Sequence, residues 1–470
     1  MFAITKLYPY QKMRNGYLYI TLLSLLGLSG QTTAQTIAQA PKLVVAIAVD
    51  QLRTDHLEVY APLYQPTGLK RMMAEGTVYN NASYRFQPVD HASAAASFAT
   101  GATPYYNGIT GKEWLDRNTL RPIKAVGNVP QNLGPIHLDT STLGDELKIA
   151  TNGVARVFAF ATDAESAILS AGHAADGAAW INQGKWQTTD YYAPANQWLS
   201  GYCRLYPPTA DVNKSLTEIA LKCCEQAGVG IDDRPDLVSI TYRVQPTMEG
   251  YVALDRTMSE LIEGITKQLP LDRVLFVLTS TGSAEEENEQ NNNAKYRIPT
   301  GRFNINRTAS LLNIYLGATY GSDQYVEAIY GNQLFLNHKL LERKNINIGE
   351  MLRRAQEFLL LISGVRNVYT SHQLMTSDSY QLERIRNGFN VEKCGDLLIE
   401  IAPGWQLVND ETHTTVMSRV SNIPFPIIFF GATVKSQRIE TPVTVDRVAP
   451  TLARAIRIRA PNACSAEPLF

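Results

Sequence analysis

The sequence contains few cysteines and almost no net charge, and each of these features excludes some classes of protein. Its 470 residues carry 43 basic and 44 acidic side chains, for a formal net charge of −1 at pH 7. This balance gives no electrostatic reason to bind nucleic acid or an anionic membrane surface, so we expect no nucleic-acid partner. The composition, 45% hydrophobic and 19% charged, is that of a globular protein with one large core and room for an insert.

The five cysteines include no C-x-x-C pair, which excludes a zinc knuckle and a thioredoxin-like motif by spacing. An odd number of cysteines leaves at least one thiol unpaired, although export would permit a disulfide among the others. We favour buried, unreactive thiols. The cysteines are Cys203, Cys223, Cys224, Cys394 and Cys464.

The sequence has one notable apolar run near its start, "YLYITLLSLLGLSG" at residues 17–30. Basic residues precede it and small residues follow it before Ala34, the pattern of a secretory signal peptide. The run is too short for a comfortable membrane span, and no basic cluster follows it. We therefore predict a signal peptide at 1–34, with Met13 as an alternative start. The mature chain is expected to be exported, periplasmic or extracellular, without a transmembrane anchor.

Short apolar runs recur along the rest of the chain, with amphipathic stretches between them. Such runs are typical of strands buried on both faces, and their alternation with helices predicts an α/β fold. We expect a doubly wound, mostly parallel sheet sandwiched by helices. Helices are expected over 251–269 and from Ser215, where Glu218 would complete a capping box. The expected strands are 43–49, 154–161, 236–242, 274–280, 396–402 and 425–431.

One span interrupts this alternation with helix and strand signals of its own, including "IGEMLRRAQEFLLLISG" at 348–364. We predict an inserted α+β subdomain at 301–375. The α/β domain would then consist of residues 35–300 and 376–470.

The first candidate functional residue is Asp50, which directly follows the first expected strand. Ligands of open α/β sheets bind beyond the carboxyl ends of the strands, where a carboxylate can hold a metal or orient a phosphate. An acid after a strand is, however, more often a turn or cap residue. Further on, "QPVDHASAAASFATG" at 87–101 predicts a tightly packed helix that begins near Asp90 and His91. Its N-terminus would offer free N–H groups and the positive end of the helix dipole.

Several stretches together resemble the alkaline phosphatase superfamily, in particular its branch of exported bacterial phosphatases related to type I phosphodiesterases and nucleotide pyrophosphatases. In order, they include "KLVVAIAVDQLR", "FATGATPYYNGITGKEWLD", "STLGDELK", "AGHAADGAAW", "PDLVSIT", "GDLLIEIAPGW" and "TPVTVDRVAPTLARAI". The resemblance implies a doubly wound α/β fold with a smaller insert. It also implies two zinc ions and a Ser or Thr nucleophile at a helix N-terminus, acting on phosphate mono- and diesters.

The residues that the resemblance places at this site mostly differ from those that the chemistry needs. Asp50 matches a metal ligand and is interpreted as a relic of the site. His91 occupies the nucleophile position, where an imidazole cannot act as a metal-bound alkoxide. Asp163 and Glu165 occupy the positions of two phosphate-binding cations, and Lys112 occupies that of an active-site asparagine.

The remaining ligand positions lack their carboxylates and imidazoles. No D-x-x-x-H pair follows "PDLVSIT", and residues 280–283 replace an Asp-His-Gly. Pro424 stands near the position of the final histidine, and His413 lies upstream of it. Because the two-zinc ligand set is not retained, we predict a degenerate active site and no bound cofactor.

These replacements predict a catalytically inactive phosphatase-like protein that acts through an unidentified envelope protein or ligand. One alternative is an active phosphate-ester hydrolase in which Asp50, Asp90, His91 and Asp163 converge on one metal that activates water. Against it, Asp90 would cap the helix and His91 would hydrogen-bond locally. Another alternative is a carbohydrate- or peptide-binding module that presents the insert, although no aromatic cluster demands this. We interpret His56, His137, His173, His338 and His372 as structural.

Overall fold

The computed structural model describes residues 39–193, 197–282, 300–417 and 423–470. Residues Ala40–Phe470 form one compact unit. The predicted signal peptide lies outside the described residues. Within the described ranges, no helix combines the length and the hydropathy that a membrane crossing requires.

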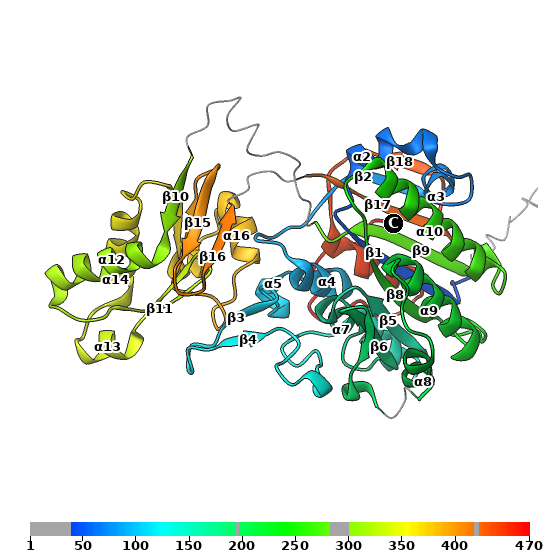
Figure 1. The fold of residues 1–470 in the computed structure, drawn as a ribbon, viewed down its shortest axis with the longest axis horizontal. Helices are drawn as coiled ribbons and strands as arrows, with labels where there is room; N and C mark the ends of the chain where they lie inside the picture. Colours follow the sequence, from blue (N-terminus) through cyan, green and yellow to red (C-terminus); the bar gives the residue numbers. More distant parts are fainter. Residues whose placement is uncertain (1–38, 194–196, 283–299, 418–422) are drawn as a thin grey trace, which may run out of the picture. The chain divides into compact units, whose positions relative to one another are not determined.

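A ten-stranded sheet lies at the centre of the described chain, with the order β18-β2-β17-β9-β1-β8-β5-β6-β7 and with β19 paired to β2. Strands β9, β1, β8, β5 and β6 run parallel, whereas β17 and β7 are antiparallel to their neighbours. This mostly parallel sheet confirms the predicted α/β class (Figure 1). The strands are β1 (Leu43–Asp50), β2 (Thr77–Ser83), β5 (Val157–Ala161), β6 (Gly177–Asn182), β7 (Lys185–Thr188), β8 (Asp236–Arg243), β9 (Val274–Ser280), β17 (Phe425–Gly431), β18 (Gln437–Ile439) and β19 (Val443–Thr444).

Both faces of the sheet are covered, because alternate side chains of each strand enter different cores. On β1, Val44, Ala46 and Ala48 belong to one core and Val45 and Ile47 to the other. The first core is completed by helices α4 (His91–Thr100), α6 (Leu143–Ala150), α7 (Ala164–Ala171) and α17 (Val448–Ala455). The second is completed by α2 (Thr54–Val59), α3 (Leu69–Glu75), α8 (Gln197–Leu205), α9 (Val212–Gln226) and α10 (Met248–Thr266).

Two details of the predicted elements are wrong. The expected strand at 396–402 exists as β14 (Leu397–Ile401), but it lies in a different sheet. Helix α9 begins before Ser215, because the Asp211 side chain caps it by accepting a hydrogen bond from the Lys214 N–H at 3.1 Å. The Ser215 hydroxyl instead donates to the Asp211 carbonyl, one turn back.

The insert contains two further sheets, of order β10-β15-β16 and β11-β12-β14-β13. It extends past the predicted boundary at residue 375, because β14 pairs with β12 and β13 and because β15 pairs with β10 (Figure 1). The apolar pattern of 396–402 identifies a strand but not the sheet that receives it. The elements are β10 (Gly301–Asn304), α12 (Ile305–Tyr320), β11 (Val326–Tyr330), β12 (Gln333–Leu336), α13 (His338–Arg343), α14 (Ile348–Leu359), β13 (Val365–Thr370), α15 (Ser371–Thr376), α16 (Glu383–Asn387), β14, β15 (Trp405–Asn409) and β16 (Thr414–Met417).

A short hairpin, β3 (Glu113–Leu115) and β4 (Pro122–Lys124), follows α5 (Pro104–Asn107). Arg117, in the turn of the hairpin, donates to both carboxylate oxygens of Asp396, at 3.1 and 3.2 Å. The hairpin is therefore tied to the loop that precedes β14.

All five cysteines are free thiols. Cys223, Cys224 and Cys394 are buried, and burial raises the pKa of Cys224 to about 12 and that of Cys394 to about 11. Thiols with such pKa values are almost entirely protonated at neutral pH and are therefore unreactive. The interpretation of these three as inert core residues is confirmed.

Candidate functional site

Asp50 lies at the carboxyl end of β1 and is almost completely buried, with 2% of its surface exposed. Thr281 follows β9, the strand beside β1, and its hydroxyl donates to Asp50 Oδ1 at 2.7 Å. The His91 Nδ1 atom lies 3.0 Å from the same oxygen. Two side chains thus converge on one oxygen of this carboxylate.

His91 is the first residue of α4, so the start of that helix directs its imidazole to Asp50. The interaction with Asp50, opposed by partial burial, raises the pKa of His91 to about 9. The Nδ1 atom is enclosed and has no well-aligned acceptor among the described residues, so the contact is mainly an ion pair. At neutral pH, His91 is therefore a cation without the lone pair that a nucleophile needs.

Asp90 and Asp163 are helix caps. Asp90 accepts from the Ser93 N–H at 2.9 Å, and its other oxygen accepts from the Lys112 N–H at 2.6 Å. Asp163 begins α7 in the same way and accepts from the Ser166 N–H and hydroxyl, both at 2.8 Å. The expectation that Asp90 caps the helix is confirmed. His91 differs from expectation, because its partner is the distant Asp50 and not a local group.

Glu165 lies in the first turn of α7 and is 9% exposed. Burial, aided by the charge of Asp163, raises the pKa of its carboxyl, whereas Lys112 and Lys124 lower it. Beyond its own backbone N–H, the Glu165 carboxylate has no hydrogen-bond partner among the described residues. It is therefore an acceptor available to a ligand.

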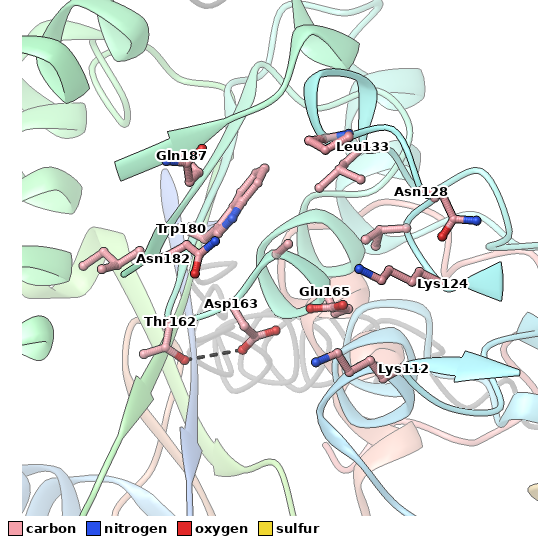
Figure 2. A pocket seen from close by; sticks show the side chains of 15 residues that line it. Lys112, Lys124, Asn128, Leu133, Thr162, Asp163, Glu165, Trp180, Asn182 and Gln187 are labelled. Carbon is pink, nitrogen blue, oxygen red and sulfur yellow. Dashed lines mark hydrogen bonds between the residues drawn. The ribbon is translucent and has the colours of Figure 1, made fainter. Parts of the chain in front are cut away.

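Glu165 lines a pocket of about 360 Å³ between α7, β6 and the β3–β4 hairpin. In Figure 2 the ammonium group of Lys124 lies above Glu165 and that of Lys112 below it, and Trp180 and Gln187 lie across the pocket. Lys112 is an exposed residue, but its Nζ reaches into this pocket. The polar lining includes Lys112, Lys124, Asp163, Glu165, Asn182 and Gln187.

The zinc chemistry implied by the family resemblance does not fit these residues. Among the described residues, no group of three or more His, Cys, Asp or Glu side chains is placed to hold a metal ion. Both oxygens of Asp90 and both of Asp163 accept hydrogen bonds from other groups, and these residues form no metal-holding group with Asp50 and His91.

The other positions that the resemblance assigns to ligands do not join the site either. After β8 the chain turns directly into α10, without a carboxylate–histidine pair. His413 is exposed between β15 and β16, in the insert.

Three residues of the site were not predicted from the sequence: Thr281 as the partner of Asp50, and Lys124 and Trp180 in the pocket. Thr281 stands where the resemblance expects a metal ligand, which was a usable signal. Lys124 and Trp180 gave none, because only the folded chain brings β4 and β6 together around α7.

Several known proteins are similar in sequence to this chain over nearly its whole length. The chain is 24% identical to alkaline phosphatase PafA of Elizabethkingia meningoseptica over 95% of its own length and 98% of that protein. It is also 24% identical to a protein of Myroides odoratus described as a calcium-transporting ATPase, over 92% of this chain and 94% of the relative. Alkaline phosphatase PhoV of Synechococcus elongatus is 22% identical, with 91% and 92% covered.

Solved structures show the same fold. The crystal structure of wild-type PafA superimposes with a TM-score of 0.78 at 21% identity, covering 92% of this chain and 99% of PafA. Murine ectonucleotide pyrophosphatase/phosphodiesterase 5 gives a TM-score of 0.56 at 10% identity, over 89% and 95% of the two chains. Residues 44–422, from β1 to beyond the insert, match the family of type I phosphodiesterases and nucleotide pyrophosphatases, and the chain belongs to that family.

Proposed function

We propose that this chain is an exported, catalytically inactive member of its family that acts in the cell envelope by binding. The observation that carries the proposal is the state of Asp50. Its Oδ1 atom accepts from Thr281 at 2.7 Å and lies 3.0 Å from His91, and among the described residues no group of three or more His, Cys, Asp or Glu side chains is placed to hold a metal ion. A protonated His91 repels a cation and cannot attack phosphorus.

The charges next to the site also disfavour the family's substrates. Asp163 and Glu165 occupy positions where the resemblance places cations. Each repels a phosphate by about 1 kcal/mol at 4 Å in water and about 4 kcal/mol at an intermediate dielectric. Ionised carboxylates here therefore weaken phosphate binding.

Export is supported by the sequence of residues 1–34, which has the three regions of a signal peptide. The partner is proposed to be an envelope protein or a small ligand, and the free polar groups of the pocket favour a ligand.

A second candidate is an active phosphate mono- or diester hydrolase with a rearranged site. One observation favours it: the Lys112 and Lys124 ammonium groups lack ion-pair partners among the described residues and reach into the pocket, where they would attract an anion. Against it, His91 stands at the nucleophile position with a pKa raised to about 9, and Asp50 is engaged by Thr281.

The deciding experiment measures bound metal and turnover together. Residues 35–470 would be equilibrated with zinc, desalted and analysed for metal per chain, then assayed with p-nitrophenyl phosphate and bis(p-nitrophenyl) phosphate. We expect no tightly held zinc and no turnover above that of His91→Ala. His91→Thr, which restores a hydroxyl but not the metal ligands, should be equally inactive.

The alkaline phosphatase PafA, carried through the same protocol, is the positive control for metal loading and assay. One or two retained zinc ions, or turnover that disappears in His91→Ala, would overturn the proposal and establish the second candidate.

A further inference from the structure

One lysine of the insert lies in a slot formed by Trp114, His137 and Asp139 of the α/β domain. Lys393, between α16 and β14, donates from Nζ to the Asp139 carboxylate at 3.1 Å and to the His137 carbonyl at 3.0 Å. The same ammonium group lies 5.0 Å from the centroid of the Trp114 ring on β3, a cation–π contact. Only 11% of the Lys393 side chain is exposed. This lysine therefore fastens the insert to the β3–β4 hairpin and to the loop that precedes α6.

The ring of His137 belongs to the slot as well as its carbonyl. It stands nearly perpendicular to Trp114, with 5.3 Å between the ring centroids, so Trp114 contacts both the imidazole and the Lys393 ammonium group. Burial and the charge of Lys393 lower the pKa of His137, and the charge of Asp139 opposes them. At neutral pH the imidazole is therefore neutral, and it tolerates the ammonium group beside it.

The two charges that act on His137 come from different parts of the chain. Lys393 belongs to the insert, and Asp139 lies two residues after His137 in the same loop. The hairpin presents the uncharged Trp114 to the slot, because its neighbour Glu113 points to the opposite face of β3. A proton on His137 would thus place a second cation beside Lys393, with the half-exposed Asp139 as their shared anion.

A second contact between the hairpin and the insert responds to acid differently. Asp396 accepts from Arg117 at 3.1 and 3.2 Å and from the Leu336 N–H at 2.8 Å, and His338 Nε2 lies 3.0 Å from its Oδ1 atom. Burial raises the pKa of Asp396, but its bonds with His338 and Arg117 outweigh burial and hold the pKa below its ordinary value. The bond with Asp396 raises the pKa of His338. Mild acid therefore leaves this contact in place.

We propose that the Lys393 slot is an acid-sensitive contact that holds the insert to the hairpin. Because the pKa of His137 is lowered on folding, the slot stabilises the fold fully above the ordinary value of 6.5, and this stabilisation is lost as pH falls through the lower, folded value. Protonated His137 repels Lys393, which leaves the slot and frees the hairpin. Strand β4 of that hairpin contributes Lys124 to the pocket beside α7, so acid acts on one wall of the pocket. The slot works in this way whether or not the chain hydrolyses phosphate esters.

Hydrogen–deuterium exchange of residues 35–470 at pH 5 and pH 7.5 tests the proposal, with each rate corrected for the chemical exchange at that pH. The informative N–H groups are those of Lys393 and Cys394, which bond to the Asn390 carbonyl at 3.2 and 2.8 Å, and that of Asp139. We expect them to open about fivefold more often at pH 5 than at pH 7.5. Strands β1 and β8 should keep their protection.

Three variants locate the effect. His137→Gln keeps a polar side chain that does not titrate, so its exchange at pH 5 should equal that of the wild type at pH 7.5. Lys393→Met removes the ammonium group and should give fast exchange at both pH values. His372→Gln is the matched control, because His372 is exposed on α15 of the insert and is not part of the slot. It should behave as the wild type does.

Exchange at these groups that acid does not accelerate in the wild type overturns the proposal, as does an acceleration that persists in His137→Gln. An equal acceleration in β1 and β8 also overturns it, since acid would then loosen the whole fold and not the slot. These results are separable from failure of the proposed function, which is measured by retained zinc and by phosphate-ester turnover.

Discussion

Two aspartate–histidine pairs of nearly equal length are held in different ways. His91 Nδ1 lies 3.0 Å from Asp50, and His173 Nδ1 lies 2.9 Å from Asp145. Asp50 receives its contacts from side chains, those of Thr281 and His91. Asp145 also accepts the backbone N–H groups of Thr142, His173 and Ala174, each at 2.8 Å.

The two kinds of donor distinguish Asp145, which is part of the scaffold, from Asp50, whose surroundings can change. Backbone donors exist whatever the side chains are, so the turn that contains His173 and Ala174 needs an acceptor such as Asp145 as long as the fold persists. Side-chain donors can be replaced one at a time. The edge of the sheet around Asp50 can therefore lose the family's chemistry while the strands and helices that surround it remain in place.

The largest effect on stability is expected when the two aspartates are replaced one at a time. Asp145→Ala leaves three N–H groups without their acceptor, one buried and two half-buried, and removes one half of the α6 capping box, so we expect it to lower the free energy of unfolding by about 3–5 kcal/mol. Asp50→Ala should cost about 1–2 kcal/mol, because the half-exposed His91 can lose its proton and turn to water. Urea denaturation followed by circular dichroism measures both. Equal losses of stability in the two variants would contradict the proposed difference between Asp145 and Asp50.

The histidines should show the opposite order. His91→Ala leaves the buried Asp50 carboxylate with the Thr281 hydroxyl as its remaining side-chain donor among the described residues, and we expect a loss of about 1–3 kcal/mol. His173→Ala leaves Asp145 with its three backbone donors and should cost about 1 kcal/mol or less. The same denaturation experiment applies. A larger loss in His173→Ala would show that its ring, and not the backbone, holds that turn.

The His91 contribution should depend on pH with a defined sign. Its pKa is raised from an ordinary value of 6.5 to about 9 in the folded protein. A raised pKa means that the pair stabilises the fold fully below about pH 6.5 and that this stabilisation is lost as pH rises through about 9. The difference in unfolding free energy between the wild type and His91→Ala should therefore shrink between pH 6.5 and 9. A constant difference would mean that the two residues form no ion pair.

Much of the fold could be predicted from the sequence, because short apolar runs identify strands wherever they pack. The runs at 43–49 and 236–242 became neighbouring parallel strands, β1 and β8. The run at 396–402 was equally apolar, yet its strand belongs to the insert. The apolar pattern indicates that a strand is buried, but the strand with which it pairs depends on residues far away in the chain.

The site was predictable only in part, for the same reason. Asp50 and the cap at Asp90 were evident from local pattern, since each sits at the end of its own element. The partner of Asp50 lies 231 residues away at Thr281, and Trp180 meets Lys124 only across a pocket. Contacts between side chains of different elements require the fold, whereas caps and strand ends do not.

The smallest expected effect sharpens the comparison within the pocket, where a carboxylate is again controlled by side chains. The pKa of Glu165 is raised by burial and lowered by Lys112 and, to a smaller extent, by Lys124. Lys112→Met should therefore raise this pKa further, and Lys124→Met should raise it less. Carbon-13 NMR of the Glu165 carboxyl across a pH titration measures the shifts, with Lys185→Met as the control that leaves it unchanged. If neither variant changed the pKa of Glu165, the two ammonium groups would point into solvent. Burial alone would then set the pKa of this carboxyl, as it does for a scaffold residue.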